Sequence, residues 1–324
     1  MKRAALFAIF LAASIGALLI ARGFSYMPTM TGGANGPQPS RWDFSTTVKW
    51  NLNPQTGSNI TGNRAVADVI TAAFNTWESA PDAVISVQRG ADSSVSAESS
   101  SPKGENLICF VCSDADFTKD VQTLAVTITT TVDAAGESSP YGVTKFPGQI
   151  IKADIIFNPN TTFTTGGTSG QDLQTVATHE IGHFFGMGHS AVVRAVMFPF
   201  ASDLTTLSWD DVAGLSTLYS KSYPDVVTGS ISGTVSNNGA GVFGAHVYAE
   251  PTAGSQPYGG SIRLTPVGAL TKPDGSYLIQ GLPPGTYTVT AEPLDGPVSN
   301  TDVNGYPSAY GQPSVNTGFT TRSH

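Results

Sequence analysis

The segment from residue 179 to residue 189, H-E-I-G-H-F-F-G-M-G-H, combines the residue types and spacing of a metal site. It holds three of the five histidines in the 324-residue chain, which are His179, His183 and His189. His179 and His183 are four apart, so on an α-helix they share one face and can reach one ion. Three nitrogen ligands leave the fourth position of a tetrahedral zinc open for water. The segment therefore predicts a catalytic zinc held by these histidines.

Two other residues of this segment complete the predicted chemistry. Gly186 lies where the helix must end, and glycine adopts a positive φ without steric cost, so the chain can turn there and bring His189 to the ion. Glu180 adjoins the first ligand and is not needed as one. It can act as general base toward a zinc-activated water and then deliver the proton to the leaving amine. We therefore predict hydrolysis of peptide bonds, with Glu180 as the catalytic residue.

The ligands require a helix over residues 172–185, and the sequence favours one. Asp172 can cap its start, and no proline interrupts it. Apolar residues recur at a spacing that gives the helix a buried side, at Leu173, Val176, Ile181 and Phe184. Two alternatives remain open. One is a core helix whose histidines are only hydrogen-bonded, and the other is a metal-binding domain without activity, against which the intact Glu180 argues.

The motif resembles that of the metzincin metalloproteases, and the sequence after it resembles the matrixin branch. Residues 195–199 read A-V-M-F-P, similar to the matrixin segment in which a methionine forms a tight turn beneath the zinc. By this resemblance Met197 is the Met-turn residue, closely followed by Pro199, and its sulfur is not a ligand. Residues 207–215 resemble the start of the last matrixin helix, with Ser208 as a plausible cap.

The resemblance implies an α+β fold with a zincin, or metzincin, catalytic domain over residues 41–222, built from a twisted mixed sheet plus helices. The upstream sequence is consistent with this fold. It predicts an amphipathic helix at residues 64–79, and strands at residues 46–52, 107–111, 121–131 and 150–158. The strand at 150–158 is expected to be the edge above the cleft. In related enzymes an extended substrate adds to such an edge by main-chain hydrogen bonds.

The implied metals are a catalytic zinc and, with weaker support, a structural calcium. The remaining histidines, His246 and His324, lie outside the protease region, so the second zinc site of vertebrate matrix metalloproteinases cannot be built the same way. We expect His246 to be a packed or surface side chain. Candidate calcium ligands are Asp133, Glu137, Asp154, Asn158 and Asn160. They form no recognisable loop signature, and solvated loop residues are the alternative reading.

The N-terminus predicts export. Lys2 and Arg3 precede an apolar run over residues 4–20, and A-R-G follows as a cleavage site. Residues 1–23 therefore read as a signal peptide, and the protein as secreted and extracellular. The alternative is an uncleaved segment that anchors the protein in a membrane, because the run is nearly long enough to span a bilayer.

The cysteines form one close pair, Cys109 and Cys112. A local disulfide, a redox motif and a metal clip are the three readings. A zinc clip needs two more ligands, and a redox role favours a pair that opens a helix, whereas this pair follows a strand-like stretch. For an exported chain we favour a structural disulfide.

The sequence changes character after residue 224. Residues 227–293 show short alternating strands with turns at D-G and P-G, and they resemble the carboxypeptidase regulatory-like domain, a small all-β, transthyretin-like sandwich. This module has no catalytic set, and its expected role is binding to a surface or substrate, spacing or stability. Residues 294–324 are rich in small and polar residues and read as a flexible tail.

Charge restricts the class of partner. The net charge is −8 and the pI about 5.0, without a basic cluster, which argues against nucleic-acid binding. The leading interpretation is a secreted zinc endopeptidase acting on protein or peptide substrates. The alternative is a surface or matrix-binding protein with a vestigial metalloprotease domain.

Overall fold

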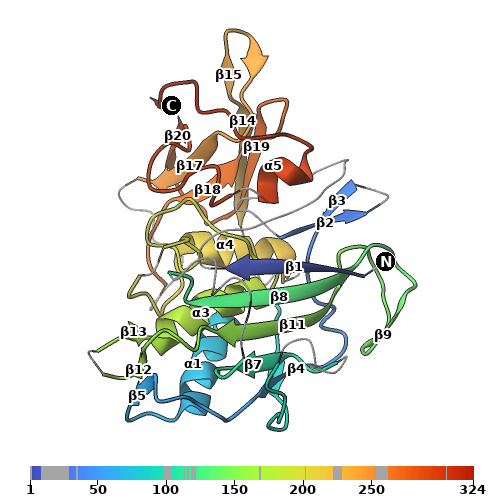
Figure 1. Ribbon diagram of the computed structural model, residues 1–324. Helices are drawn as coiled ribbons and strands as arrows, with labels where there is room; N and C mark the ends of the chain where they lie inside the picture. The colour runs from blue at the N-terminus through green and yellow to red at the C-terminus, as the bar shows by residue number, and fades with distance from the viewer. Residues whose placement is uncertain are drawn as a thin grey trace.

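The chain is mixed α+β in the computed structural model (Figure 1). The structure describes residues 2–8, 29–33, 36–97, 104–112, 114, 117, 122–167, 169–200, 202–221, 228–252, 262–303 and 305–324. The predicted signal peptide lies mostly outside these residues and stays a prediction. Of its residues, the structure describes only Lys2–Ala8, which form strand β1.

A six-stranded mixed sheet forms the base of the N-terminal part of the chain, in the order β1-β8-β11-β7-β4-β6. In that order its strands are Lys2–Ala8, Ala125–Val132, Ile150–Phe157, Leu107–Cys109, Val48–Leu52 and Val87–Arg89. Strands β11, β7, β4 and β6 run parallel, and β8 runs antiparallel to β11. Strand β1 pairs antiparallel with the other side of β8, from Lys2 opposite Val132 to Ala8 opposite Val126.

The strand predicted at residues 150–158 is present as β11, but its expected place at the edge is wrong. It lies between β8 and β7, and both of its faces are buried. Ile155 packs in the cluster that faces the helices, and Ile156 packs in a second cluster on the opposite face. Successive strand residues point to opposite faces, so a strand buried on both sides is an interior strand. On this side β8 separates β11 from β1, which is the outermost strand.

Two helices cover one face of the sheet. Helix α3, Leu173–Phe184, packs on β8 and β11, and helix α1, Val66–Glu78, packs on α3. The apolar residues that predicted the helix at 64–79 are buried at Val69, Ile70, Ala73, Phe74 and Trp77. The amphipathic pattern therefore identified both the helix and its buried face.

The opposite face of the sheet carries a smaller apolar cluster, which contains Leu107, Val126 and Ile156. Cys109 and Cys112 belong to it and are bonded to each other. The predicted disulfide is therefore confirmed, and it links the end of β7 to the following turn.

The C-terminal part follows helix α4, Trp209–Leu218, in the sequence and consists mainly of strands (Figure 1). One pair is β14 with β19, Gly229–Thr234 with Ser276–Leu282, and a four-stranded sheet follows the order β18-β17-β20-β21. The bounds in that sheet are Val267–Leu270, His246–Pro251, Tyr287–Glu292 and Arg322–Ser323. Trp209 and Ala213 of α4 share a buried cluster with these strands, so the two parts have a common core.

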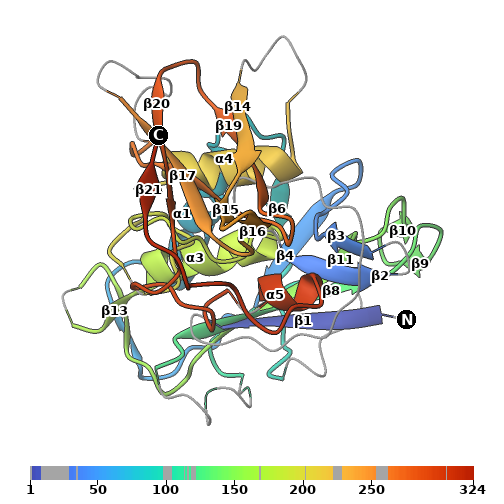
Figure 2. The same ribbon diagram turned by 90° about the horizontal axis from the view of Figure 1, so that it is seen from above.

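Residues 294–324 differ from the flexible tail that we expected. They contain helix α5, Gly305–Ala309, and strand β21, which pairs with β20. Leu294, Val298, Val303 and Val315 are buried with Phe243 and Leu270 of the C-terminal part. Figure 2 shows α5 beside strand β2, Met30–Gly33, at the N-terminal side of the molecule. Isolated apolar residues in a polar stretch gave no periodic signal, yet they bury together.

Short strands complete the description. They are β3 (Gly36–Pro39), β5 (Ile60–Gly62), β9 (Ser138–Ser139), β10 (Gly142–Val143), β12 (Phe163–Thr165), β13 (Gln171–Asp172), β15 (Ser236–Asn237) and β16 (Ala240–Gly241).

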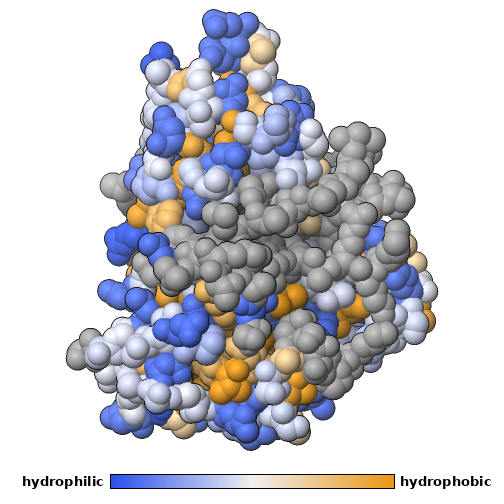
Figure 3. Space-filling model, viewed as in Figure 1, coloured by the Kyte–Doolittle hydropathy of each residue, from blue (hydrophilic) through white to orange (hydrophobic). Residues whose placement is uncertain are grey.

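Hydrophilic residues cover most of the C-terminal strands on the face in Figure 3. No helix among the described residues has the length and apolar character needed to cross a membrane.

Candidate metal centre

Helix α3 positions the first two predicted ligands. Its N-cap is Asp172, as predicted, and the Asp172 carboxylate accepts a hydrogen bond from the backbone N–H of Thr175 at 2.8 Å. This bond satisfies one of the N–H groups that a helix start leaves without a partner. His179 and His183 lie one turn apart on the same face, with ring centroids 4.8 Å apart.

The turn after the helix brings the third histidine to the same place. Gly186 has φ +86°, and a Cβ there would overlap the carbonyl oxygen of Ser40, so this position requires glycine on two grounds. His189 follows, and ligand nitrogens of His179, His183 and His189 all lie within 4.8 Å of one another. In the part of the chain that the structure describes, this is the one group of three or more His, Cys, Asp or Glu side chains close enough to share an ion.

Each imidazole is oriented through its Nδ1 atom by a backbone carbonyl. The three partners are the carbonyl oxygens of Val196 at 2.7 Å, Met187 at 2.7 Å and Asp302 at 3.1 Å, for His179, His183 and His189 respectively. A carbonyl oxygen only accepts hydrogen bonds, so each Nδ1 carries the proton. In the neutral rings each Nε2 therefore presents a lone pair, the form in which histidine binds a metal.

The Nε2 atoms fit a cation between them. Those of His179 and His183 are 3.1 Å apart, and with both protons on Nδ1 this contact is not a hydrogen bond. Two lone pairs at this distance repel unless a positive charge lies between them, and zinc at 2.0–2.1 Å from each nitrogen would place them about 3.3 Å apart. The Nε2 atom of His189 is buried and has no hydrogen-bond partner in the protein. The donor set therefore suits zinc.

Burial also keeps the three rings neutral. It lowers the pKa of His179 to about 3, with a further lowering by His189, and it lowers the pKa values of His183 and His189 as well. Because a metal and a proton compete for the same lone pair, these lowered pKa values favour metal binding at neutral pH.

Glu180 is completely buried beside the first ligand in α3. Thr127 of strand β8 donates a hydrogen bond from Oγ1 to Glu180 Oε2 at 2.5 Å. Burial raises the pKa of Glu180 to about 8, and the bond from Thr127 opposes this rise. No sequence pattern pointed to Thr127, because the contact depends on the position of β8 beside the helix.

Met197 packs against helix α3 at Gly182. It is fully buried, and its Sδ occupies the space that a side chain on Gly182 would need. Pro199 is also buried. Gly182 lies inside the motif, between Glu180 and His183, but the sequence alone does not single it out. Only glycine fits at this position because the Met197 sulfur packs against it.

A carboxylate at the start of α4 holds the Met197 turn. Asp211 accepts hydrogen bonds from the backbone N–H groups of Val196 and Met197 at 2.9 and 3.1 Å. It also accepts bonds from Ser208, which caps α4 as predicted and completes a capping box. Since the Val196 carbonyl orients His179, the chain of contacts from α4 reaches the predicted ligands.

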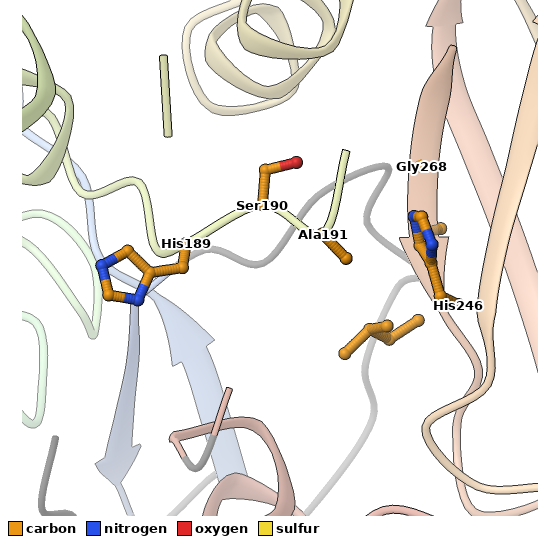
Figure 4. A pocket seen from close by; sticks show the side chains of 7 residues that line it. His189, Ser190, Ala191, His246 and Gly268 are labelled. Carbon is orange, nitrogen blue, oxygen red and sulfur yellow. The ribbon is translucent and has the colours of Figure 1, made fainter. Parts of the chain in front are cut away.

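His246 does not join the three ligands. It is buried in β17, as a packed side chain, and its Nδ1 is 3.0 Å from Glu292 Oε1. Figure 4 shows His246 and His189 on opposite sides of a small cavity, with Ser190 and Ala191 between them. The cavity therefore lies between the segment after helix α3 and strands β17 and β18.

The predicted calcium ligands have other partners where the structure records them. Asp154 accepts from the backbone N–H of Leu107 at 2.7 Å and pairs with Lys152 at 2.7 Å. The Asn158 side chain donates to the carbonyl of Thr123 at 2.7 Å. The bond from Leu107 to Asp154 joins strands β7 and β11 of the main sheet.

Comparison with known proteins agrees with this geometry. Residues 128–220 match the matrixin family, and residues 230–304 match the carboxypeptidase regulatory-like domain. Matrilysin of Rattus norvegicus is 38% identical over 90 residues, which cover 26% of this chain and 34% of that protein. Metalloendoproteinase 1 of Glycine max is 47% identical over 55 residues, 16% of this chain and 18% of that protein.

A human relative gives the same result. Matrix metalloproteinase-25 of Homo sapiens is 41% identical over 85 residues, which cover 24% of this chain and 15% of that protein. The chain thus spans about a third or less of the length of these relatives. The aligned family segment nevertheless contains the complete histidine motif and Met197. The chain therefore carries a matrixin domain followed by a carboxypeptidase regulatory-like domain.

Proposed function

We propose that this protein is a secreted zinc-dependent endopeptidase that hydrolyses peptide bonds of extracellular proteins. The observation that carries this proposal is the convergence of three Nε2 lone pairs, from His179, His183 and His189, in a site whose Nδ1 atoms are all fixed by carbonyl groups. Such a site binds zinc through three nitrogens and leaves a position for the reaction.

The chain's own residues divide the work of hydrolysis. A zinc ion bound there would supply a Lewis acid that polarises the scissile carbonyl and makes water acidic. Glu180 would accept the proton from the attacking water and deliver it to the leaving nitrogen. Its hydrogen bond from Thr127 stabilises the carboxylate form, which a general base requires. The contact between Met197 and Gly182 would fix the position of helix α3, which carries His179 and His183.

Strand β8 is the proposed binding edge for the substrate. Thr127, which contacts Glu180, belongs to it, so a chain paired with β8 would pass close to the catalytic residue. The antiparallel pairing of β1 with β8 supports the capacity of this edge to take an extended segment. Removal of residues 1–23, the predicted signal peptide, would leave the edge available to a protein substrate.

The remaining assignments follow the same reading. We propose a metzincin fold for residues 41–222, a transthyretin-like sandwich for residues 227–293 and export through residues 1–23, with membrane anchoring if that segment is retained. The C-terminal module would then contact a surface or substrate. A structural calcium has weaker support, because Asp154 is held by Lys152 and by a backbone N–H.

Hydrolysis of casein by the purified protein tests the proposal. We expect activity that a zinc chelator abolishes and that added zinc restores. A protein that binds one zinc per chain and hydrolyses neither casein nor gelatin would instead favour the alternative, a surface-binding protein with a vestigial protease domain.

A further inference from the structure

The hydrogen bonds that orient the three histidines do not all come from the matrixin domain. Val196 and Met187, which bind His179 and His183, lie close to their partners in sequence. The carbonyl that binds His189 belongs to Asp302, 113 residues further along the chain. One of the three ligands is therefore held by the C-terminal part.

A compact turn presents this carbonyl. The Asp302 carboxylate accepts hydrogen bonds from the backbone N–H and the hydroxyl of Ser299, both at 2.8 Å. The backbone N–H of Asp302 donates to the Ser299 carbonyl at 3.1 Å, and that of Tyr306 donates to the carbonyl of Val303 at 2.8 Å. The side chain of Asp302 thus fixes the backbone whose carbonyl meets His189.

Packing and hydrogen bonds hold this turn against the C-terminal strands. Val303 is buried in one cluster with Leu270 of β18, and Ala191 and Phe198 of the matrixin domain pack against the same cluster. The Tyr306 hydroxyl donates to the carbonyl groups of Leu270 and Thr271, at 3.1 and 3.2 Å. The position of the Asp302 carbonyl is therefore determined by the packing of the C-terminal part.

Hydrogen bonds and apolar packing join the C-terminal part to the matrixin domain. The Asp210 carboxylate of α4 accepts from the backbone N–H of Gly268 at 2.8 Å and from the hydroxyl of Ser190, next to His189, at 2.5 Å. Trp209 and Ala213 lie in the core of the C-terminal strands. The C-terminal part thus contacts both α4 and the segment that carries the third ligand.

We propose that Asp302 is a positioning residue of the metal centre, and that the C-terminal part completes the zinc site by orienting His189. This inference rests on the proposed zinc site. Partners that hold the second nitrogen of a metal-binding histidine fix its tautomer and ring orientation, and their loss typically weakens metal binding about 10- to 100-fold. The C-terminal part therefore has a role in zinc retention that is separate from any binding of surfaces.

The test measures zinc affinity in the full chain by competition with a chromophoric chelator, without substrate. We expect Asp302→Ala to weaken zinc binding by about 10-fold or more, because the turn loses its side-chain bonds. Asp302→Asn keeps an acceptor oxygen and should bind zinc nearly as well as the wild type. Asp295→Ala removes the same charge from an exposed position of the same segment and should have no effect.

A spectroscopic readout separates positioning from general damage. In histidine-labelled, zinc-loaded protein, Asp302→Ala should speed the exchange of the Nδ1 proton of His189 and leave those of His179 and His183 unchanged. Unchanged zinc affinity and unchanged exchange in Asp302→Ala would overturn the proposal. Equal losses in the Ala and Asn variants would also overturn it, since the effect would then come from charge. Zinc affinity and proton exchange are both measured without substrate, so they can be read even if the protein hydrolyses no peptide bond. Failure of this proposal is therefore distinguishable from failure of the proposed function.

Discussion

The sulfur of Met197 lies against Gly182, in the space that a Cβ atom at position 182 would occupy. Trp77 of helix α1 approaches the same Cβ position, with its Cζ2 atom 2.8 Å from it. The ligand helix is thus fixed between a methionine and a tryptophan at the turn between His179 and His183. A change of one methyl group at this point should disturb both packing and metal binding.

Gly182→Ala should destabilise the protein by about 1–3 kcal/mol, the usual cost of overpacking a filled core. Denaturant unfolding of the zinc-free protein measures this change. Gly296→Ala is the matched control, because Gly296 is exposed and a Cβ there meets no atom within 4 Å. Equal stability of the two variants would show that Met197 does not restrict position 182.

Thr127→Val should lower kcat/KM about 10- to 100-fold, because a hydrogen bond to a charged group contributes roughly 1.5–3 kcal/mol. The bond from Thr127 lowers the pKa of Glu180, so its loss should also move the acid limb of the pH–rate profile to higher pH. Thr127→Ser keeps the hydroxyl and should restore both quantities. An unchanged profile in the valine variant would refute the role of this bond.

Asp210 should make the stability of the protein depend on pH. Burial raises its pKa from 3.8 to about 7, so between these values the folded state holds a proton that the unfolded state releases. The stabilisation is complete below pH 3.8 and is lost as pH rises through about 7, by about 4 kcal/mol in all.

Asp210→Asn removes this titration. The amide oxygen can still accept from the backbone N–H of Gly268, and the amide nitrogen can donate to the hydroxyl of Ser190. Relative to the wild type, the free energy of unfolding of the variant should therefore rise between pH 4 and pH 8. Urea unfolding in the presence of a chelator gives the comparison without metal. A difference between the two proteins that stays constant with pH would contradict the raised pKa.

Zinc should stabilise the wild type and not His183→Ala. Binding to the folded state at 100 times the dissociation constant adds about 2.7 kcal/mol, which appears as a higher melting temperature. His324→Ala, which changes an exposed histidine away from the three ligands, should respond to zinc like the wild type. A zinc-dependent rise of the same size in His183→Ala would exclude this residue as a ligand.

Local patterns were sufficient for the elements that carry two of the ligands. The Asp172 cap, the apolar side of the helix and the glycine turn at Gly186 are all encoded within a few residues, and each is present in the structure. The helix at Val66–Glu78 was equally clear, because its buried residues repeat with the helical period.

Contacts between distant residues were not predictable in this way. Strand β11 reads I-I-K-A-D-I-I-F, nearly continuous in apolar residues, which is typical of an interior strand and argues against an edge position. Thr127 and Asp302 carry no such pattern, because each meets the metal centre through tertiary packing alone.

The most direct test of the proposed chemistry compares zinc content and casein hydrolysis in the wild type and Glu180→Ala. Both proteins should bind one zinc per chain, since Glu180 is not a ligand. The variant should lose at least about 100-fold in rate, because the general base is absent. A zinc-loaded Glu180→Ala protein that hydrolyses casein at the wild-type rate would contradict the assignment of Glu180 as the catalytic residue.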